Sequence, residues 1–362
     1  MNVPAGPAAT SAGSGVASPS FEDDLVERVL AVARTWSPNT AVRSLETVSK
    51  GSSGLTYAVT FGVGGREVSA YVKVAPPGLA PVRNRDVLRQ AALVEELHRD
   101  GSVPVPQVLF ADAGSPPEVP PFFVIAAVEG SCVEPLIDDA VLPEPRVLTS
   151  RSTDAARILA LLHRFDPAAV RGRGLADTDD EVDLCGEVDR WARIFTKLER
   201  DGSGADHSLS RQADRCADLL RASAPAPLTP VVVHGDFRLG NLVCDDRGVR
   251  AILDWEIWSL TDPRIDVAWF LMTLSPQGLP SAIRAEAAGL LSPDAALAIY
   301  EETTGSSLAD LTWFAALSRY RSAAAMALNV KHNRRRPEPN PRIEAYAERL
   351  PTFLTHAIDL LA

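Results

Sequence analysis

Three oxygen-bearing side chains stand at fixed spacing in the segment from residue 231 to residue 256: Asp236, Asn241 and Asp254. Carboxylate and amide oxygens are suitable ligands for Mg²⁺, a hard cation that binds oxygen. A separate carboxylate can orient an attacking hydroxyl and accept its proton. Phosphoryl transfer needs these two functions, because its transition state is stabilised mainly by positioning and by neutralisation of charge. The segment therefore predicts Mg²⁺-dependent phosphoryl transfer.

Short strands and a turn are expected to hold these side chains. The apolar run 231–233 predicts a buried strand that ends before the first aspartate. The apolar run 242–244, the turn sequence 245–248 and the run 249–253 predict a hairpin, and Asp254 follows its second strand. An ordinary buried hairpin with solvated acidic turns is the alternative interpretation. The spacing of the asparagine and of the second aspartate favours a catalytic segment.

The sequence HGDFRLGN at 234–241, followed by DWE at 254–256, resembles the aminoglycoside phosphotransferase and choline kinase-like family. The resemblance implies a protein-kinase-like fold and the use of ATP or GTP with Mg²⁺ to phosphorylate a small molecule. It also implies that Asp236 is the catalytic carboxylate and that Asn241 and Asp254 bind the metal ion. The order of the three residues is the order found in kinases.

Four further polar residues near these motifs are expected to be structural. His234 is expected to brace the loop that carries Asp236, and Arg238 to form an ion pair near that aspartate. Asp266 matches an acidic position of the family and is interpreted as a second brace for the loop. His163 lies in a predicted amphipathic helix, which favours a hydrogen-bonded core histidine over a catalytic one.

The region after Asp254 indicates a small-molecule acceptor with a hydroxyl group. A protein kinase has a long activation segment after its metal-binding aspartate, whereas here a few residues separate Asp254 from a predicted helix at 267–274. The complete HGDFRLGN sequence is similar to the kinase domain of acyl-CoA dehydrogenase fusions, which implies a hydroxyacyl acceptor; an aminoglycoside-like acceptor is the other candidate. The basic run 331–336 is interpreted as a solvated face, with recognition of an anionic acceptor as the alternative.

An antiparallel sheet is expected near the N-terminus, with strands at 43–48, 56–63 and 67–74. In the third strand apolar and polar side chains alternate, so Lys73 lies on the face away from the core. By the family resemblance Lys73 contacts the phosphates of ATP. An ordinary hairpin turn is the alternative for the loop before the second strand. The resemblance makes it a nucleotide-covering loop whose amides approach phosphate, formed by Gly51, Ser52, Ser53 and Gly54.

The helix predicted at 84–100 departs from the kinase pattern. A kinase helix in this place supplies a glutamate that pairs with the lysine. The aligned residue here is Gln90, which can accept a hydrogen bond from the lysine amine but cannot neutralise it. Glu95 or Glu96 replaces it only if the helix has a different register. This departure supports an alternative function, a nucleotide-binding pseudokinase that acts as an interaction module without turnover.

The apolar segment 120–128 predicts a strand that leads from one lobe to the other. By the family resemblance, main-chain groups near Ala126 and Val128 hold the adenine ring. An ordinary core strand has the same apolar content, and the sequence alone does not separate the two interpretations.

The expected fold class is α+β: a bilobal protein-kinase-like fold with an antiparallel sheet in the N-lobe and a mainly helical C-lobe. Helices of the C-lobe are predicted at 153–165, 189–198 and 210–222. The expected units are a disordered tail at 1–20, an N-terminal nucleotide-binding lobe at 21–128 and a C-terminal catalytic and substrate lobe at 129–362.

Composition limits the class of partner. The chain has 362 residues and a formal net charge of −11, which disfavours nucleic acid as a partner. A run of eighteen apolar residues is absent from the sequence, so no membrane-spanning helix is predicted. The four cysteines lack the CxxC spacing of zinc sites and are expected to be reduced, as in a cytoplasmic protein.

Overall fold

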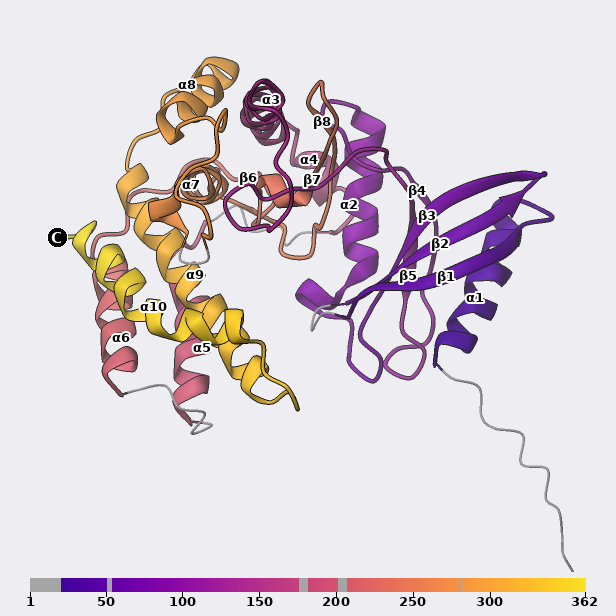
Figure 1. The fold of residues 1–362 in the computed structure, drawn as a ribbon, viewed down its shortest axis with the longest axis horizontal. Coiled ribbons are helices and arrows are strands. Elements are labelled where there is room, and N and C mark those ends of the chain that lie inside the picture. The colour runs from indigo at the N-terminus through magenta and orange to yellow at the C-terminus, as the bar shows by residue number, and fades with distance from the viewer. Residues whose placement is uncertain (1–20, 51–53, 176–181, 201–206, 280–281) are drawn as a thin grey trace, which may run out of the picture.

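The computed structural model describes residues 21–50, 54–175, 182–200, 207–279 and 282–362. Figure 1 shows a sheet at one end of the molecule and a group of helices at the other. The predicted tail at 1–20 and three residues of the predicted nucleotide-covering loop, Gly51, Ser52 and Ser53, lie outside the described residues.

The N-terminal part is built on a five-stranded antiparallel sheet with the order β1-β2-β3-β5-β4. Its strands are β1 (Ala41–Lys50), β2 (Leu55–Val63), β3 (Arg66–Val74), β4 (Val108–Asp112) and β5 (Phe122–Ala126). The three predicted strands are confirmed with small changes at their ends, and β5 falls within the predicted segment 120–128. The sequence analysis did not predict β4, which pairs with β5 at the edge of the sheet.

The alternation in β3 has the predicted consequence. Val72 and Val74 are fully buried in a core that also contains Phe61, whereas Lys73 points to the opposite face. Helix α1 (Phe21–Trp36) covers the core face, and its buried residues include Leu25 (Figure 1). The period of two in the strand therefore separates the valines that stabilise the sheet from Lys73 on the opposite face.

Helix α2 (Val87–Asp100) packs against β4 and β5. It begins three residues later than the predicted start at residue 84, because Asp86 is its N-cap and accepts a hydrogen bond from the Arg89 amide at 3.0 Å. A short 3₁₀ turn, η1 (Arg83–Arg85), precedes the cap. Gly101 ends the helix in the left-handed conformation that is typical of a C-cap glycine.

Two small antiparallel pairs hold the segment from residue 231 to residue 256. The predicted hairpin is confirmed as β7 (Leu242–Cys244) and β8 (Val249–Ile252). The strand before it, β6 (Val231–Val233), pairs with β9 (Ser259–Thr261), which the sequence analysis did not predict. The short turn η2 (Leu239–Asn241) leads from the first aspartate into β7.

The C-terminal part is mainly helical, as predicted, and each predicted helix lies within or overlaps a longer observed one. Two apolar clusters form its core: one includes α3 (Pro145–His163) and α8 (Pro293–Thr304), and the other joins the long helices between residues 184 and 222 to those between residues 311 and 359. The helices are α3 (Pro145–His163), α4 (Ala168–Arg171), α5 (Leu184–Arg200), α6 (His207–Ala222), α7 (Arg264–Thr273), α8 (Pro293–Thr304), α9 (Leu311–Arg334) and α10 (Pro341–Asp359), with a 3₁₀ turn η3 (Pro276–Gly278).

The fold is therefore a two-lobed α+β fold, with an antiparallel sheet in one lobe and a helix-rich second lobe (Figure 1). Within the described residues, none of the helices combines the length and the apolar character that a membrane crossing would need.

Candidate functional site

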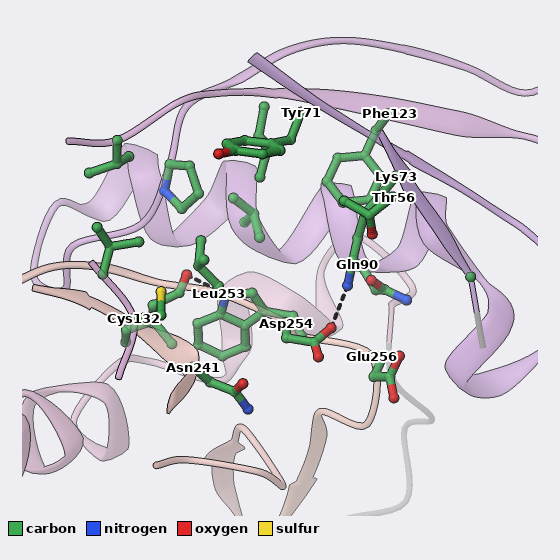
Figure 2. A pocket seen from close by; sticks show the side chains of 18 of the residues that line it. Thr56, Tyr71, Lys73, Gln90, Phe123, Cys132, Asn241, Leu253, Asp254 and Glu256 are labelled. Atoms are coloured by element: carbon green, nitrogen blue, oxygen red, sulfur yellow. Dashed lines mark hydrogen bonds and ion pairs between the residues drawn. The ribbon is translucent and has the colours of Figure 1, made fainter. Parts of the chain in front are cut away.

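A cavity of about 580 Å³ lies between the sheet and the hairpin of the helical lobe. Its wall on the sheet side includes Lys73 and Phe123, and its opposite wall includes Asn241 and Asp254 (Figure 2). The volume is in the range of small-molecule and cofactor sites. The structure thus brings residues from distant parts of the chain to one cavity, and the predicted site residues that line it are Gly54, Lys73, Gln90, Ala126, Val128, Asn241 and Asp254.

An ion pair crosses this cavity. The Lys73 ammonium of β3 donates to Oδ1 of Asp254, which lies 181 positions later in the sequence (Figure 2). Burial alone would raise the pKa of Asp254, but the charge of Lys73 and its hydrogen bond bring the pKa below the ordinary value for aspartate. Asp254 has a φ of +63°, in the left-handed region that non-glycine residues rarely adopt. The backbone strain is located where the carboxylate must face the lysine.

Gln90 lies beside the cavity but does not pair with Lys73. Its amide nitrogen donates to the carbonyl of Asn84 at 3.1 Å. Its Oε1 is buried and has no hydrogen-bond partner in the described part of the chain, and Figure 2 shows Gln90 among the side chains that line the cavity. Glu95 and Glu96 pair with Arg173 instead, so a shifted helix register does not supply the missing glutamate.

At the end of β5, some main-chain N–H and C=O groups form hydrogen bonds within the described ranges of the chain and others do not. The N–H of Ala126 donates to the carbonyl of Gln107 at 2.9 Å, and the N–H of Ala127 donates to Ser69 at 3.0 Å. The main-chain groups of Val128 form no hydrogen bond with any residue that the structure describes. Of the two predicted adenine contacts, Val128 therefore has the main-chain donor and acceptor that can bind a planar ring edge.

Asp236 does not line the cavity wall, but it is hydrogen-bonded to Asn241, which does. Both its backbone carbonyl and its Oδ2 accept hydrogen bonds from the Asn241 amide nitrogen, at 2.9 and 2.8 Å. Oδ1 accepts from the indole N–H of Trp269 on α7 at 2.9 Å. Arg238 donates to the same carboxylate at 3.3 Å, which confirms the predicted ion pair. The carboxylate is thus oriented by three donors and its side chain remains 27% exposed.

His234 and Asp266 brace the loop, as predicted. Nε2 of His234 donates to the carbonyl of Leu253 at 2.7 Å, and Nδ1 accepts from the Asp236 amide at 3.1 Å. The Asp266 carboxylate accepts from the amides of His234 and Gly235 at 2.6 and 2.8 Å. Full burial of Asp266 would raise its pKa, but its hydrogen bonds with His163 and with the Gly235 amide hold the pKa below the ordinary value.

His163 is the core histidine that the sequence predicted. Its Nδ1 lies 2.8 Å from the hydroxyl of Tyr300, and its Nε2 lies 3.5 Å from Asp266. Only 7% of its surface is exposed, so it supports the brace without reaching the cavity.

Glu134 and Trp269 are contacts of this site that sequence reasoning missed. The buried Glu134 carboxylate accepts from Arg238 at 3.2 Å and from the Gly240 amide at 3.1 Å. Burial raises the pKa of Glu134, and the neighbouring Arg238 opposes that rise. Neither residue lies in a recognisable motif, and their partners are 104 and 33 positions away in the sequence. Glu134 is one of several acidic residues in the segment after the lobe-linking strand, so no signal in the sequence singled it out.

The donor set fits a magnesium ion held together with a nucleotide. The amide nitrogen of Asn241 is bonded to Asp236, so its amide oxygen is the atom left for a metal. Asp254 supplies the carboxylate on the same cavity wall. The described residues contain no cluster of three or more His, Cys, Asp and Glu side chains arranged for a metal ion. Mg²⁺ is commonly held by one or two carboxylates together with substrate phosphates and water, which agrees with this small set.

The basic run 331–336 at the end of α9 does not face the cavity. Arg334 pairs with Glu344 of α10 through its Nε at 2.8 Å, Lys331 is buried, and His332 and Arg335 are exposed. The arrangement favours the interpretation as a largely solvated face over recognition of an anionic acceptor.

Comparison with known proteins places this geometry in a family. The profile of the phosphotransferase enzyme family (APH) matches residues 44–302. The sequence is 30% identical over 232 residues to "Probable acyl-CoA dehydrogenase IBR3" of Arabidopsis thaliana, and this match covers 61% of this chain and 27% of that protein. It is 26% identical over 292 residues to acyl-CoA dehydrogenase family member 11 of Rattus norvegicus, covering 78% and 36%. The chain thus spans about a third or less of these curated relatives.

Solved structures share the fold at low sequence identity. A predicted aminoglycoside phosphotransferase from Ralstonia eutropha superimposes with a TM-score of 0.71 at 20% identity, covering 94% of this chain and 98% of that one. Macrolide 2′-phosphotransferase type I gives a TM-score of 0.58 at 19% identity, covering 92% and 98%. The match to the family profile extends from β1 into α8 and includes the cavity, so the chain belongs to the phosphotransferase enzyme family and has the two-lobed fold of the small-molecule kinases.

Proposed function

We propose that this phosphotransferase moves the γ-phosphoryl group of ATP to the hydroxyl of a small hydroxyacyl compound. The supporting observation is the pair of hydrogen bonds from Asn241 to Asp236, at 2.8 and 2.9 Å. These bonds tie the Asp236 carboxylate, which lies outside the cavity wall, to Asn241 in that wall. The same wall carries Asp254, which faces Lys73 across the cavity. A proton acceptor, a metal-binding pair and a phosphate-binding cation then meet at one place, which is what phosphoryl transfer needs.

Asp236 is assigned to the acceptor hydroxyl. Its carboxylate is partly exposed and accepts bonds from Trp269, Asn241 and Arg238, so its orientation is fixed before the acceptor binds. A carboxylate held in this way can orient the hydroxyl and take its proton as the new P–O bond forms. Preorganisation avoids the cost of rotating the side chain during the reaction.

The cavity is assigned to the nucleotide. Lys73 contacts the phosphates, Val128 and Ala126 border the adenine ring, and Asn241 and Asp254 hold Mg²⁺. When bound, Mg²⁺ neutralises the charge that develops on the phosphate oxygens. Gly54, which the structure describes, has a position where an added Cβ would approach the Val74 carbonyl to 3.2 Å. Gly54 lines the cavity, and the close approach to this carbonyl leaves little room for a larger side chain. Gln90 lines the Lys73 side of the cavity, but its Oε1 is buried and is assigned no contact with the nucleotide.

The acceptor class is supported by the relatives and by the surroundings of Asp236. The curated relatives carry acyl-CoA dehydrogenase names, which supports a hydroxyl on an acyl compound. Beyond Asn241, the side chains that contact the Asp236 carboxylate are a tryptophan and an arginine rather than acids. An aminoglycoside is a polycation and would need an acidic surface, so the aminoglycoside-like acceptor is the weaker of the two candidates.

The test is acceptor-dependent release of ADP with Mg·ATP and a panel of hydroxyacyl-CoA compounds, aminoglycosides, macrolides and choline-like amines. The expected result is turnover with a hydroxyacyl compound and a product heavier by one phosphoryl group in mass spectrometry. GTP is assayed in parallel as the alternative donor. Nucleotide binding without turnover across the whole panel would favour the pseudokinase alternative. Turnover with an aminoglycoside alone would overturn the acceptor class and keep the kinase.

A further inference from the structure

Arg321, in the middle of α9, is a buried cation that the proposed reaction does not yet use. Only 3% of its surface is exposed. One Nη donates to the carbonyl of Gly235 at 2.7 Å. Gly235 has a φ of +87°, and a Cβ there would lie 2.8 Å from the Ile257 carbonyl, so this turn is fixed from both sides. Arg321 therefore holds the peptide carbonyl directly before Asp236.

The same guanidinium contacts a tryptophan that binds Asp236. Its central carbon lies 5.2 Å from the ring centroid of Trp269 and 5.2 Å from that of Trp191 on α5, within the range of cation–π contacts. The indole N–H of Trp269 donates to Asp236 Oδ1 at 2.9 Å. One side chain thus reaches Asp236 by two routes, through the backbone and through the ring.

The charge of Arg321 is poorly matched by its surroundings. The nearest carboxylate oxygen, on Glu187, lies 3.9 Å from Nε. Nε and the second Nη are buried and have no hydrogen-bond partner among the residues that the structure describes. Burial lowers the pKa of Arg321, but a guanidinium remains protonated in proteins. A buried charge without a close partner lowers the stability of the fold. Stability alone therefore does not explain why Arg321 is buried at this position.

We propose that Arg321 is a positioning residue for phosphoryl transfer, which holds Asp236 in place through the Gly235 carbonyl and the Trp269 ring. The inference rests on the proposed role of Asp236. It assigns no contact between Arg321 and the acceptor, because the free guanidinium nitrogens are buried.

The test compares the same substitution at two arginines of one helix. Arg321→Met removes both routes to Asp236 and keeps an unbranched side chain. Arg319→Met is the matched control, because the Arg319 guanidinium donates to Ala315 of its own helix at 3.1 Å and contacts no part of the loop in the structure described. A displacement of about 1 Å at a reacting group can lower the rate about 100-fold.

We expect Arg321→Met to lower kcat by about 10- to 100-fold and to change KM for ATP by less than about threefold. Arg319→Met should change kcat and KM for ATP by less than about threefold each. Arg321→Lys keeps a charge and a donor and should recover part of the loss. Trp269→Phe keeps the ring but removes the donor. Its loss of kcat should not add fully to that of Arg321→Met, because both act through one carboxylate. An Arg321→Met enzyme with wild-type kcat would overturn the inference.

A second measurement does not need turnover and separates this inference from the proposed function. In protein labelled with ¹⁵N-tryptophan, the Trp269 indole resonance is identified by its absence in Trp269→Phe. Arg321→Met should move this resonance and speed the exchange of its proton, and Arg319→Met should not. An unmoved resonance would overturn the positioning role of Arg321, whether or not the enzyme is active. An absence of activity with every acceptor would instead count against the proposed function alone.

Discussion

The Asn241 amide nitrogen donates to both the backbone carbonyl and the Oδ2 of Asp236, at 2.9 and 2.8 Å. This double contact uses the nitrogen end of the amide completely and turns the oxygen end away from Asp236. An asparagine suits both proposed roles, because its amide nitrogen can donate to Asp236 while its amide oxygen can bind the metal ion. An aspartate in its place would repel the neighbouring carboxylate.

Asp236→Asn is expected to lower kcat by at least about 100-fold, because the amide cannot accept the hydroxyl proton. Nucleotide affinity, measured by calorimetry with Mg·ADP, should change little, since Asp236 lies outside the cavity wall. Asp246→Asn, in the exposed turn between β7 and β8, is the control and should keep full activity. An Asp236→Asn enzyme with near-normal turnover would remove Asp236 from the chemical step.

Lys73→Ala is expected to weaken productive ATP binding by about 10- to 100-fold, the effect of losing a charge-assisted hydrogen bond of about 1.5–3 kcal/mol. The measurement is KM for ATP together with direct nucleotide binding. Arg66→Ala is the matched control, because it removes a cation from the exposed start of the same strand. Unchanged kinetics for Lys73→Ala would exclude the lysine from the nucleotide site.

Metal dependence should follow Asp254 and Asn241. Removing Mg²⁺ with a chelator is expected to abolish turnover, and added Mg²⁺ should restore it. Asp254→Asn and Asn241→Ala should each raise the Mg²⁺ concentration needed for half-maximal activity, because the first removes the negative charge of one proposed ligand and the second removes the other proposed ligand. If both variants responded to Mg²⁺ as the wild type does, the metal would have to be bound elsewhere.

Asp266→Asn should destabilise the fold by about 1–3 kcal/mol at pH 7, because the amide cannot accept from both the His234 and Gly235 amides. The folded-state pKa of Asp266 is lowered, so the unfolded chain binds more protons near pH 4 and stability falls as the pH falls. The difference between wild type and variant in urea unfolding should therefore shrink from about pH 4 downward. Asp218→Asn, at a side chain that is 77% exposed, should show no such difference at any pH.

Gly235→Ala should cost more than Gly305→Ala, although both glycines have positive φ angles, of +87° and +74°. An alanine in the left-handed region costs about 1–2 kcal/mol at either position. At Gly305 a Cβ meets open space, whereas at Gly235 it lies 2.8 Å from the Ile257 carbonyl. Thermal unfolding of the two variants measures this difference, and equal losses would show that the loop yields to the added carbon.

The sequence predicted the parts of the site that depend on local pattern. The alternation in β3 placed Lys73 away from the core, and the turn sequence before Gly248 identified the β7–β8 hairpin. The family resemblance is confirmed, as is the fold class. The roles assigned to the individual site residues stay predictions, which the variants above test. The limits assigned to the two lobes also stay predictions.

Contacts between distant segments could not be predicted in the same way. Glu134, Trp269 and Arg321 contact the Asp236 loop from three separate elements. A tryptophan or arginine on a helix has the same sequence pattern whether it packs in the core or supports a reacting group. The Gln90 amide shows the limit most clearly, because alignment placed it opposite Lys73 but its hydrogen bond goes to Asn84.

The imidazole of His234 sets the distance between the segment that carries Asp236 and the segment that carries Asp254. It is bonded at one nitrogen to the peptide before Asp254 and at the other to the amide of Asp236, so the width of a single aromatic ring sets the separation between the two loops. A planar ring does not stretch, so it works as a rigid spacer. The span between the proposed proton acceptor, Asp236, and the proposed metal ligand, Asp254, is thus set within one lobe, independently of the ion pair that Asp254 forms with Lys73 of the other lobe.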